Sequence, residues 1–402
     1  MGSGLRSNRS SAPFRTSRDG ATMPEPRLPA VVLALATALV LTTPPAAAAP
    51  ADTAFAVAEL PGLPGYPTHR AIALNDLGQV VGATYGNGAP HAVLWSPGGA
   101  ATDLGTGVPT AINRRGQVLG LVPVSGAGPY VQEPKIWFEG RVTDLTPAGA
   151  GWVIAQAINS HGVVPMTYSP SPAGYHQDRA SVWRDGRHVP LPLPGAHLWL
   201  DAVNDAGVVV GSRTPMSGEP YAFRCPTTAS CAPLAAAPGT GGYAVEAVNE
   251  AGVVVGNRYP LALRWEGDAV TVLADEGGVA DGPQAINERG DVVGWSAVGG
   301  VRRAVVWPGG GKPVVLGVPG PAEAVAVNER GDVVGWTSAE DPDAPRAFLW
   351  RDGRVTYLGS LGGAHSLPVA INDRGVVVGE STTADGVLKA VRWTPVPTTP
   401  IH

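Results

Sequence analysis

Charged side chains are scarce in this chain of 402 residues: Asp, Glu, Lys and Arg make up 15% of it, and the net charge is −5. So weak a negative charge gives no electrostatic reason to expect nucleic acid or an anionic membrane as a partner. Only two cysteines occur, so at most one disulfide can form within the chain. Apolar residues nevertheless make up 44%, enough for a folded core.

Catalytic motifs are also missing. The sequence has no Ser-His-Asp order, no Gly-x-Ser-x-Gly, no His-Glu-x-x-His, no phosphate loop and no Cys-x-x-Cys pair. Histidines are few and scattered, with His69, His197 and His365 between apolar segments. The sequence therefore predicts no catalytic residue, no cofactor and no metal site.

Long apolar runs are absent except near the N-terminus. From Met23 the chain has a short segment with Arg27, an apolar stretch from Ala30 to Leu41 and a small-residue tail, which is typical of a secretory signal peptide. Twelve apolar residues are too few to span a bilayer, so we expect no stable membrane insertion. We interpret residues 1–51 as an upstream segment plus signal peptide, 52–395 as one domain and 396–402 as a tail, and we expect a secreted or extracellular protein.

What the sequence does contain is one segment written many times, as in "AINDRGVVVGES" (370–381) and "AINERGDVVGWS" (285–296). Alignment on the central Asn gives eight copies with spacings of 38 to 46 residues. That period is typical of propeller blades, and the abundance of Val, Gly and Trp argues against helical repeats. The aligned residues are Asn75, Asn113, Asn159, Asn204, Asn249, Asn287, Asn328 and Asn372.

Turn signals divide each copy into four strands, A to D. Asn-x-x-Gly between apolar runs predicts a type I turn with a Gly bulge joining strands A and B, so we assign this Asn to turn formation rather than catalysis. Asp-Gly or Glu-Gly, as in "FLWRDGRVTYL" (348–358), predicts a tight hairpin joining strands C and D. Gly- and Pro-rich crossovers lead from strand D to the next strand A.

The two ends of the domain complement each other. The last copy stops after strand C at Trp393, whereas residues 54–60 form an apolar strand ahead of the first crossover. The sequence therefore predicts an all-β, eight-bladed β-propeller of four-stranded antiparallel blades, in which residues 54–60 complete the last blade. The alternative is seven blades with one degenerate copy, because Pro165 and Met166 stand where other copies have Val-Gly.

Tryptophan ends strand C in seven copies, and we expect these side chains to pack between blades rather than to stack on a ligand. The eighth copy has Cys225 there, and Cys231 follows across the C–D hairpin. In an exported protein such a pair should be oxidised, so we predict a Cys225–Cys231 disulfide. The seven are Trp95, Trp137, Trp183, Trp265, Trp307, Trp350 and Trp393.

Three aromatic residues fall outside this pattern: Trp152, Trp199 and Tyr243 precede the turn Asn by seven, five and six residues. The B–C and D–A loops leave an antiparallel blade on one face, so we expect these aromatics, exposed around the rim of the axis, to bind a ligand together with His365. The alternative is that they plug the mouth of the channel.

Carboxylates suggest two further sites. Asp201 and Glu246 lie three residues before the turn Asn and Glu323 lies five before it; such a group could serve a glycosidase, although we favour a structural interpretation. Glu340, Asp341 and Asp343 could hold calcium, but the segment lacks the spacing of a dedicated site, which favours a solvated loop.

Several elements recur in the same order: the triplets "HAV" (91–93), "YAF" (221–223) and "RAF" (346–348), and "DLGTG" or "YLGSLGG" ahead of "AIN". Over residues 54–395 the chain thereby resembles the extracellular HAF-repeat family. The resemblance implies export and repetition without an established activity. The full His-Ala-Phe triplet is absent, which argues against a ligand role for that His.

Two functions remain open. The first is a non-enzymatic propeller that binds a surface polymer, glycan or protein through its B–C and D–A loop face. The alternative is a polysaccharide hydrolase or lyase with its site at the mouth of the central channel. In either case we expect a monomer with an extracellular glycan or protein as its ligand, and no nucleic acid.

Overall fold

The computed structural model describes residues 54–124, 131–170, 178–193, 195, 197–273 and 281–396. The chain divides into two units, Met1–Pro50 and Ala51–His402, and every described residue belongs to the second. The predicted signal peptide and residues 397–402 of the tail lie outside the described residues.

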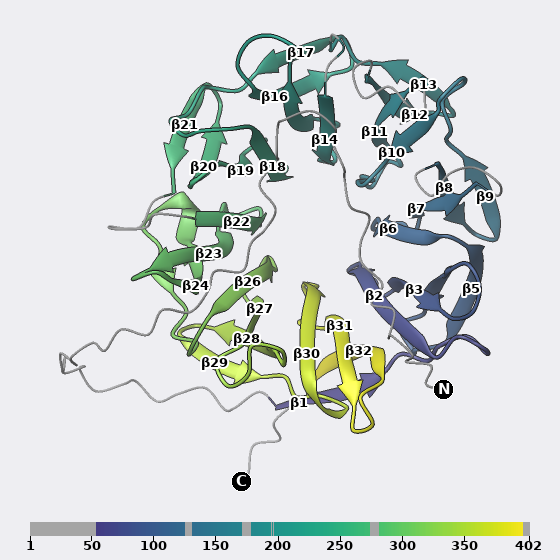
Figure 1. Ribbon diagram of the computed structural model, residues 1–402, viewed down its shortest axis with the longest axis vertical. Coiled ribbons are helices and arrows are strands. Elements are labelled where there is room, and N and C mark those ends of the chain that lie inside the picture. The colour runs from purple at the N-terminus through teal and green to yellow at the C-terminus, as the bar shows by residue number, and fades with distance from the viewer. Residues whose placement is uncertain are drawn as a thin grey trace, which may run out of the picture. The chain divides into compact units, whose positions relative to one another are not determined.

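Within this part of the chain, thirty-two strands form eight four-stranded antiparallel sheets arranged as blades around one axis (Figure 1). The predicted eight-bladed β-propeller is thus confirmed, and the alternative of seven blades is wrong. Strand A of each blade lies nearest the axis, and strands B, C and D follow outward in chain order.

The first four blades are β2 (Thr68–Leu74), β3 (Val80–Tyr85), β4 (His91–Trp95), β5 (Ala101–Thr106); β6 (Val108–Ile112), β7 (Val118–Pro123), β8 (Gln132–Phe138), β9 (Arg141–Asp144); β10 (Trp152–Ile154), β11 (Val164–Ser169), β12 (Arg179–Arg184), β13 (Arg187–Pro190); and β14 (His197–Val203), β15 (Val209–Thr214), β16 (Tyr221–Thr227), β17 (Ser230–Pro233). The next three are β18 (Tyr243–Val248), β19 (Val254–Arg258), β20 (Leu261–Glu266), β21 (Ala269–Val272); β22 (Asp281–Ile286), β23 (Val292–Val298), β24 (Val301–Trp307), β25 (Val314–Val315), with a 3-10 turn at Pro308–Gly310; and β26 (Ala322–Val327), β27 (Val333–Thr337), β28 (Arg346–Arg351), β29 (Arg354–Tyr357).

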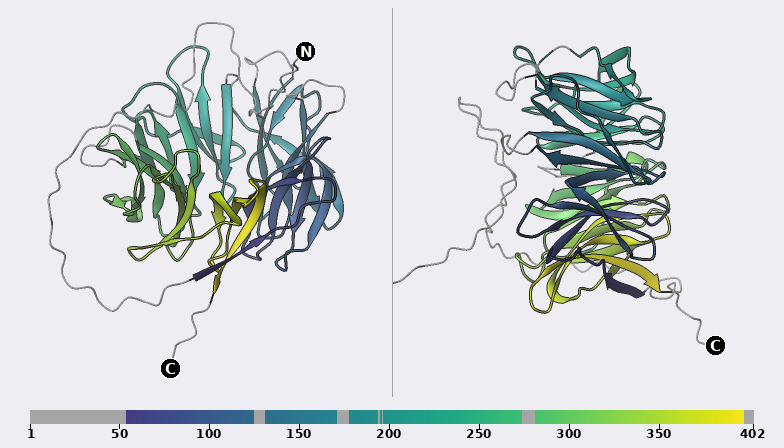
Figure 2. Two further views of the ribbon diagram at one scale, coloured as in Figure 1. Left: turned by 60° about the horizontal axis from the view of Figure 1, so that its bottom comes forward. Right: turned by 90° about the vertical axis from the view of Figure 1, so that its right-hand side faces the viewer.

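Blade 8 combines both ends of the domain. It consists of β30 (Gly362–Ile371), β31 (Val377–Thr383), β32 (Leu388–Val396) and the N-terminal β1 (Ala54–Glu59). Strand β1 pairs antiparallel with β32 from Ala54↔Val396 to Glu59↔Val391, and both views in Figure 2 show the purple and yellow strands side by side. The predicted closure of the ring by the N-terminal strand is therefore confirmed.

The Asn-x-x-Gly turns have the predicted local geometry. In the first turn the N–H of Gly78 donates to the carbonyl of Asn75 at 2.9 Å, the N–H of Asn75 donates to Gln79 at 3.1 Å, and Gly78 has φ +83°. This is the bond pattern of a type I turn with a Gly bulge. The side-chain oxygen of Asn75 also accepts from the N–H of Gln79 at 3.0 Å.

The same Asn side chains join neighbouring blades, which the sequence did not predict. The amide of Asn75 donates to the backbone carbonyl of Asn113 at 3.0 Å, each following Asn repeats this bond, and Asn372 returns to Asn75 at 3.3 Å. Eight buried amides thereby form a closed cycle of hydrogen bonds around the ring. A buried amide without such partners would be strongly destabilising, so this cycle favours a closed ring.

Strand-C tryptophans form much of the packing. Five of the seven are at most 5% exposed, and Trp183 and Trp350 pack half-buried against the clusters between blades. The indole N–H of Trp265 donates to the carbonyl of Ala235 at 2.9 Å, in the crossover that leads into the same blade. The predicted interblade role is confirmed.

Strand A contains a second recurring feature, a β-bulge. In seven blades its register with strand B shifts at the residue three before the turn Asn, which forms a β-bulge. The bulge brings its backbone close to a Gly of strand B: a Cβ on Gly211 would lie 1.9 Å from the carbonyl oxygen of Trp199. In blade 3 the corresponding position is Met166, and β10 is only three residues long. Blade 3 therefore forms with a shorter strand A and without the Gly that the other copies have at this position.

Candidate functional site

The eight innermost strands give the ring two chemically different ends. All eight run toward their Asn-x-x-Gly turns, so the A–B turns gather at one end, which we call the turn end. The B–C and D–A connections gather at the other, the loop end, as follows from antiparallel pairing within each blade.

Three of the four predicted ligand-binding residues lie on the less buried face of innermost strands. In β14, Leu198 and Leu200 are 1% and 4% exposed, whereas Trp199 between them is half-buried. Trp152 in β10 and His365 in β30 are likewise half-buried, and each precedes a buried residue. All three precede their turn Asn by an odd number of residues, so strand alternation gives them the same orientation. The structure thus places Trp152 and Trp199 on neighbouring blades.

Tyr243 precedes its turn Asn by six residues and therefore has the opposite orientation. It is 9% exposed, and its hydroxyl accepts the N–H of Ala237 at 3.0 Å. The Arg258 guanidinium stacks 4.9 Å from its ring centre, and Trp265 lies 6.1 Å away. The expectation that Tyr243 is an exposed rim aromatic is wrong, because it packs between blades 4 and 5.

His365 belongs to a contact between blades 8 and 1. Its Nε2 atom lies 3.5 Å from Oε1 of Glu380, and Oε2 of Glu380 lies 3.4 Å from Nε of Arg70 in β2. The Arg70 side chain is 52% exposed, so its guanidinium remains accessible on the inner face of the ring.

Carboxylates occupy the inner face beyond the two Trp residues. Asp201 and Glu246 are the bulged residues of β14 and β18, and Glu323 lies in β26. Burial, with a contribution from the charge of Glu246, raises the pKa of Asp201 to about 7. Burial likewise raises the pKa of Glu246, to which Glu323 adds. Of the three carboxylates singled out in the sequence, Glu246 therefore lies within electrostatic range of Asp201 and of Glu323.

The partners of these carboxylates differ. Glu323 accepts from Arg302 at 2.7 Å, and the Arg302 guanidinium stacks over Trp295 at 4.2 Å. The Oδ2 atom of Asp201 is buried and has no hydrogen-bond partner among the described residues. A carboxyl group with a pKa near 7 can donate a proton to a ligand oxygen at neutral pH, and an ionised one can accept from a hydroxyl or amine.

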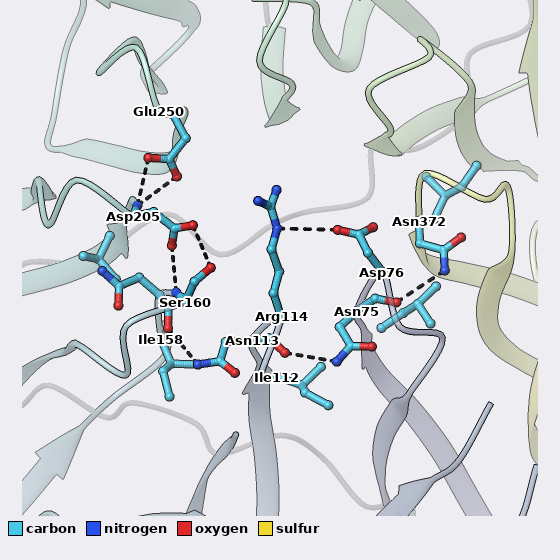
Figure 3. Close-up of a pocket in the computed structure, with 14 residues that line it drawn as sticks. Asn75, Asp76, Ile112, Asn113, Arg114, Ile158, Ser160, Asp205, Glu250 and Asn372 are labelled. Carbon is cyan, nitrogen blue, oxygen red and sulfur yellow. Dashed lines mark hydrogen bonds and ion pairs between the residues drawn. The ribbon is translucent and has the colours of Figure 1, made fainter. Parts of the chain in front are cut away.

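A cavity of about 270 Å³ lies at the opposite end, among the A–B turns (Figure 3). Its walls comprise turn residues of blades 1 to 5 and 8, and it contains none of the predicted ligand-binding residues. Carboxylates of Asp76, Asp205 and Glu250 reach it, together with the guanidinium of Arg114.

The residue after each turn Asn has a repeating role at this end. The carboxylate of Asp205 accepts the N–H of Ser160 at 2.7 Å, and that of Glu250 accepts the N–H of Asp205 at 2.8 Å. Six blades supply such a carboxylate to the preceding turn, the exceptions being Arg114 and Ser160. This ring of carboxylates was not predicted from the sequence, although an acidic residue follows the turn Asn in six of the eight copies.

The predicted disulfide is confirmed. Cys225 and Cys231 are bonded across the β16–β17 hairpin with their Cα atoms 4.0 Å apart. Cys225 is fully buried where other blades have tryptophan. Disulfides persist in oxidising environments, which agrees with an extracellular location.

Calcium at Glu340, Asp341 and Asp343 finds no support: Glu340 pairs with Arg346 at 2.7 Å, and Asp341 accepts the N–H of Asp343. Across the described ranges, no group of three His, Cys, Asp or Glu residues is arranged to hold a metal ion. Nor does this part of the chain contain a helix with the length and apolar character needed to cross a membrane.

Comparison with known proteins gives the fold alone. No family model matches the chain, and no curated protein matches it significantly. Porphyromonas gingivalis dipeptidyl peptidase 4 is 9% identical with a TM-score of 0.51, over 78% of this chain and 55% of that one. The β-propeller domain of the Trilobed protease from Pyrococcus furiosus is 11% identical with a TM-score of 0.49, over 73% and 97%. Streptogramin B lyase is 10% identical with a TM-score of 0.45, over 85% and 98%. At these identities the likeness extends to the β-propeller architecture and not to activity.

Proposed function

We propose that the protein is an exported, non-enzymatic β-propeller that binds a surface glycan through its loop end, where the B–C and D–A connections gather. A surface protein or another polymer is the alternative ligand of the same face. Export is supported by the Cys225–Cys231 disulfide and by the signal-peptide pattern within residues 23–51.

The observation that carries the proposal is the pair Trp152 and Trp199. Two half-buried indoles lie on the innermost strands of neighbouring blades, and Trp199 is on the face of β14 opposite the buried leucines. A flat apolar ring with a polar edge is suited to stacking against the C–H face of a sugar while the indole N–H bonds a hydroxyl.

Polar groups beyond the indoles support a saccharide rather than an apolar peptide. Asp201 follows Trp199 by two residues in β14, and Glu246 lies in the adjoining blade. Arg70 and His365 add donors on blades 1 and 8. Sugar hydroxyls can donate to the carboxylates and accept from the cations, so the set is suited to a polyhydroxylated ligand.

The test is glycan-array binding by the exported form of the chain, followed by affinity measurement with the best glycan. The double variant Trp152→Ala/Trp199→Ala should weaken binding at least tenfold. The matched control is Tyr357→Ala, which removes an aromatic that is 41% exposed on the outermost strand β29 and should leave binding unchanged. Unchanged affinity in the double variant would refute the proposal, and binding of a protein instead of any glycan would select the alternative ligand.

One observation favours a second function, a polysaccharide hydrolase or lyase. A carboxyl group with a pKa of about 7, next to a second carboxylate, resembles a general acid and its partner. Here Asp201 would protonate the leaving oxygen and Glu246 would act as base. Release of reducing ends or of an unsaturated product, lost in Asp201→Asn, would support catalysis; binding without turnover would exclude it.

A further inference from the structure

Each turn of the ring offers one backbone N–H at the residue after the turn Asn, and in six of the eight turns a carboxylate of the following blade caps it. Glu250 receives the N–H of Asp205 at 2.8 and 3.0 Å through its two oxygens, and Asp373 receives that of Glu329 at 2.9 Å. Wherever such an N–H is capped by the following blade, the capping group is a carboxylate. A carboxylate oxygen that accepts a backbone N–H makes a charge-assisted hydrogen bond, which is stronger than one between neutral groups.

The cycle has eight N–H groups but only six carboxylates, so it is interrupted at one place. Blade 2 has Arg114 at this position, which provides no acceptor, and the Ser160 hydroxyl of blade 3 donates to Asp205 at 2.6 Å. As a result, the N–H groups of Asp76 and Arg114 have no acceptor among the described residues, whereas the six others have one.

The cavity of about 270 Å³ lies at this interruption. Its walls include Asp76, Arg114 and Ser160, the three residues at which the cycle is broken or ends. Figure 3 shows the Arg114 side chain extending among these turns, with one ion pair from its Nε to Asp76 at 3.5 Å. The side chain is 63% exposed, and no contact is drawn to its two terminal nitrogens.

We propose that this cavity binds the carboxylate group of a ligand, which takes the place of the missing side-chain carboxylate between blades 1 and 2. Its oxygens accept the N–H of Asp76, as those of Glu250 accept the N–H of Asp205, and the Arg114 guanidinium neutralises its charge. The site lies at the turn end, opposite the proposed glycan site, and does not depend on that proposal.

The side-chain carboxylates of the ring do not prevent a ligand carboxylate from binding in the cavity. The ring already places carboxylates next to each other: Glu288 lies between Glu250 and Glu329, and burial together with these two charges raises its pKa. Each stays in place because it caps an N–H. At the interruption a cation replaces one of the acids, so a ligand carboxylate meets less repulsion there than a seventh side-chain carboxylate would.

The decisive variant is Arg114→Glu, which gives blade 2 the acidic residue type that six of the other blades have. Its own carboxylate should cap the N–H of Asp76 and compete with the ligand, so the variant should fold with unchanged or higher thermal stability and lose binding at least tenfold. Arg115→Glu is the matched control: it makes the same charge change one residue away, on an exposed side chain outside the cavity, and should retain binding.

Binding is measured by calorimetry and NMR with acetate, glucuronate, and a short peptide with a free or an amidated C-terminus. Saturable binding of at least one free carboxylate, lost in Arg114→Glu and kept in Arg115→Glu, supports the proposal; the arms show whether an acid sugar or a peptide terminus is preferred. The proposal is wrong if no carboxylate binds, if inorganic phosphate binds more tightly, or if Arg114→Glu binds as well as the wild type. Should Arg114→Glu not fold, Arg114→Gln replaces it, with the same expected loss. The Trp152→Ala/Trp199→Ala variant should bind carboxylates normally, which separates this site from the glycan site.

Discussion

Replacement of Asp201 by Asn should stabilise the protein at alkaline pH and not at acid pH. In the fold, burial and Glu246 raise the pKa of Asp201 from 3.8 to about 7. Between about pH 4 and pH 7 the folded chain therefore holds a proton on Asp201 that the unfolded chain has lost. Stability falls as the pH rises through this window, because the folded state must ionise a carboxyl group that is buried and has an unpartnered oxygen. Asn has no charge to ionise, so the variant escapes this loss.

The magnitude follows from the two pKa values. A difference of about 3 pH units, at ~1.4 kcal/mol for each, corresponds to about 4 kcal/mol. Urea unfolding followed by tryptophan fluorescence, at about pH 4 and about pH 8, gives the free energies of unfolding of both proteins. The difference between variant and wild type at the higher pH, minus the same difference at the lower pH, should approach about 4 kcal/mol in favour of the variant. This double difference cancels packing changes that do not depend on pH.

Two results decide the matter. The control Asp268→Asn removes an exposed carboxylate in the β20–β21 hairpin and should give a double difference near zero. If Asp201→Asn also gives a value near zero, or makes the protein less stable at the higher pH than at the lower, then Asp201 is not held in a buried, charge-opposed environment. Asp201 would then be ionised at neutral pH and could not supply the proton donor proposed for the inner face.

Three further predictions concern the framework. Trp265→Ala should lower the free energy of unfolding by about 3–5 kcal/mol, because the indole is 1% exposed and donates a hydrogen bond to the crossover at Ala235. Tyr357→Ala, on the exposed outer strand, should lower it by less than about 0.5 kcal/mol, and urea titrations compare the two variants. Asn159→Ala removes one hydrogen bond to Asn204 and two from the N–H groups of His161 and Val163, so it should lower the free energy of unfolding by about 3 kcal/mol. Replacement of the exposed Asn87 by Ala is the control and should be neutral. If thermal unfolding fails to separate the two variants, the structural role of the Asn cycle is contradicted. Cys225→Ala/Cys231→Ala should lose about 2 kcal/mol by opening a short loop, a difference that should vanish when both proteins are measured under reducing conditions.

Local signals made the blades predictable. The Asn-x-x-Gly turn, the Asp-Gly hairpin and the missing last strand each depend on residues close in sequence, and together they gave the blade count, the closure by β1 and the pairing of Cys225 with Cys231. The copy with Pro165 and Met166 was also correctly predicted to form a blade. The sequence did not show how its strand A differs: Met166 stands where the other copies have a Gly that lies close to the backbone of strand A, and β10 is short.

Contacts between blades were harder to predict. The amide of Asn75 finds its acceptor 38 residues away, and the carboxylate of Asp76 finds its partner at Asp373, 297 residues away. Such bonds appear only when the ring is assembled. The same limit explains Tyr243, since the sequence showed an aromatic near a crossover, but one position in the strand alternation decided that it is buried. Two ends of opposite character, with Trp152 and Trp199 at one and Arg114 at the other, could be compared only after assembly.

Everything proposed for the inner face requires that β1 completes blade 8 and holds the ring closed. Hydrogen–deuterium exchange of the backbone amides, read by mass spectrometry or NMR, tests this directly. Those amides of residues 54–59 that face β32 should be protected from exchange, whereas the alternate amides on the open edge of the sheet exchange freely, because the two strands share an antiparallel ladder from Ala54 to Glu59. Exchange of residues 54–59 at the rate of an unstructured peptide, while β30 and β31 remain protected, would contradict the closed ring.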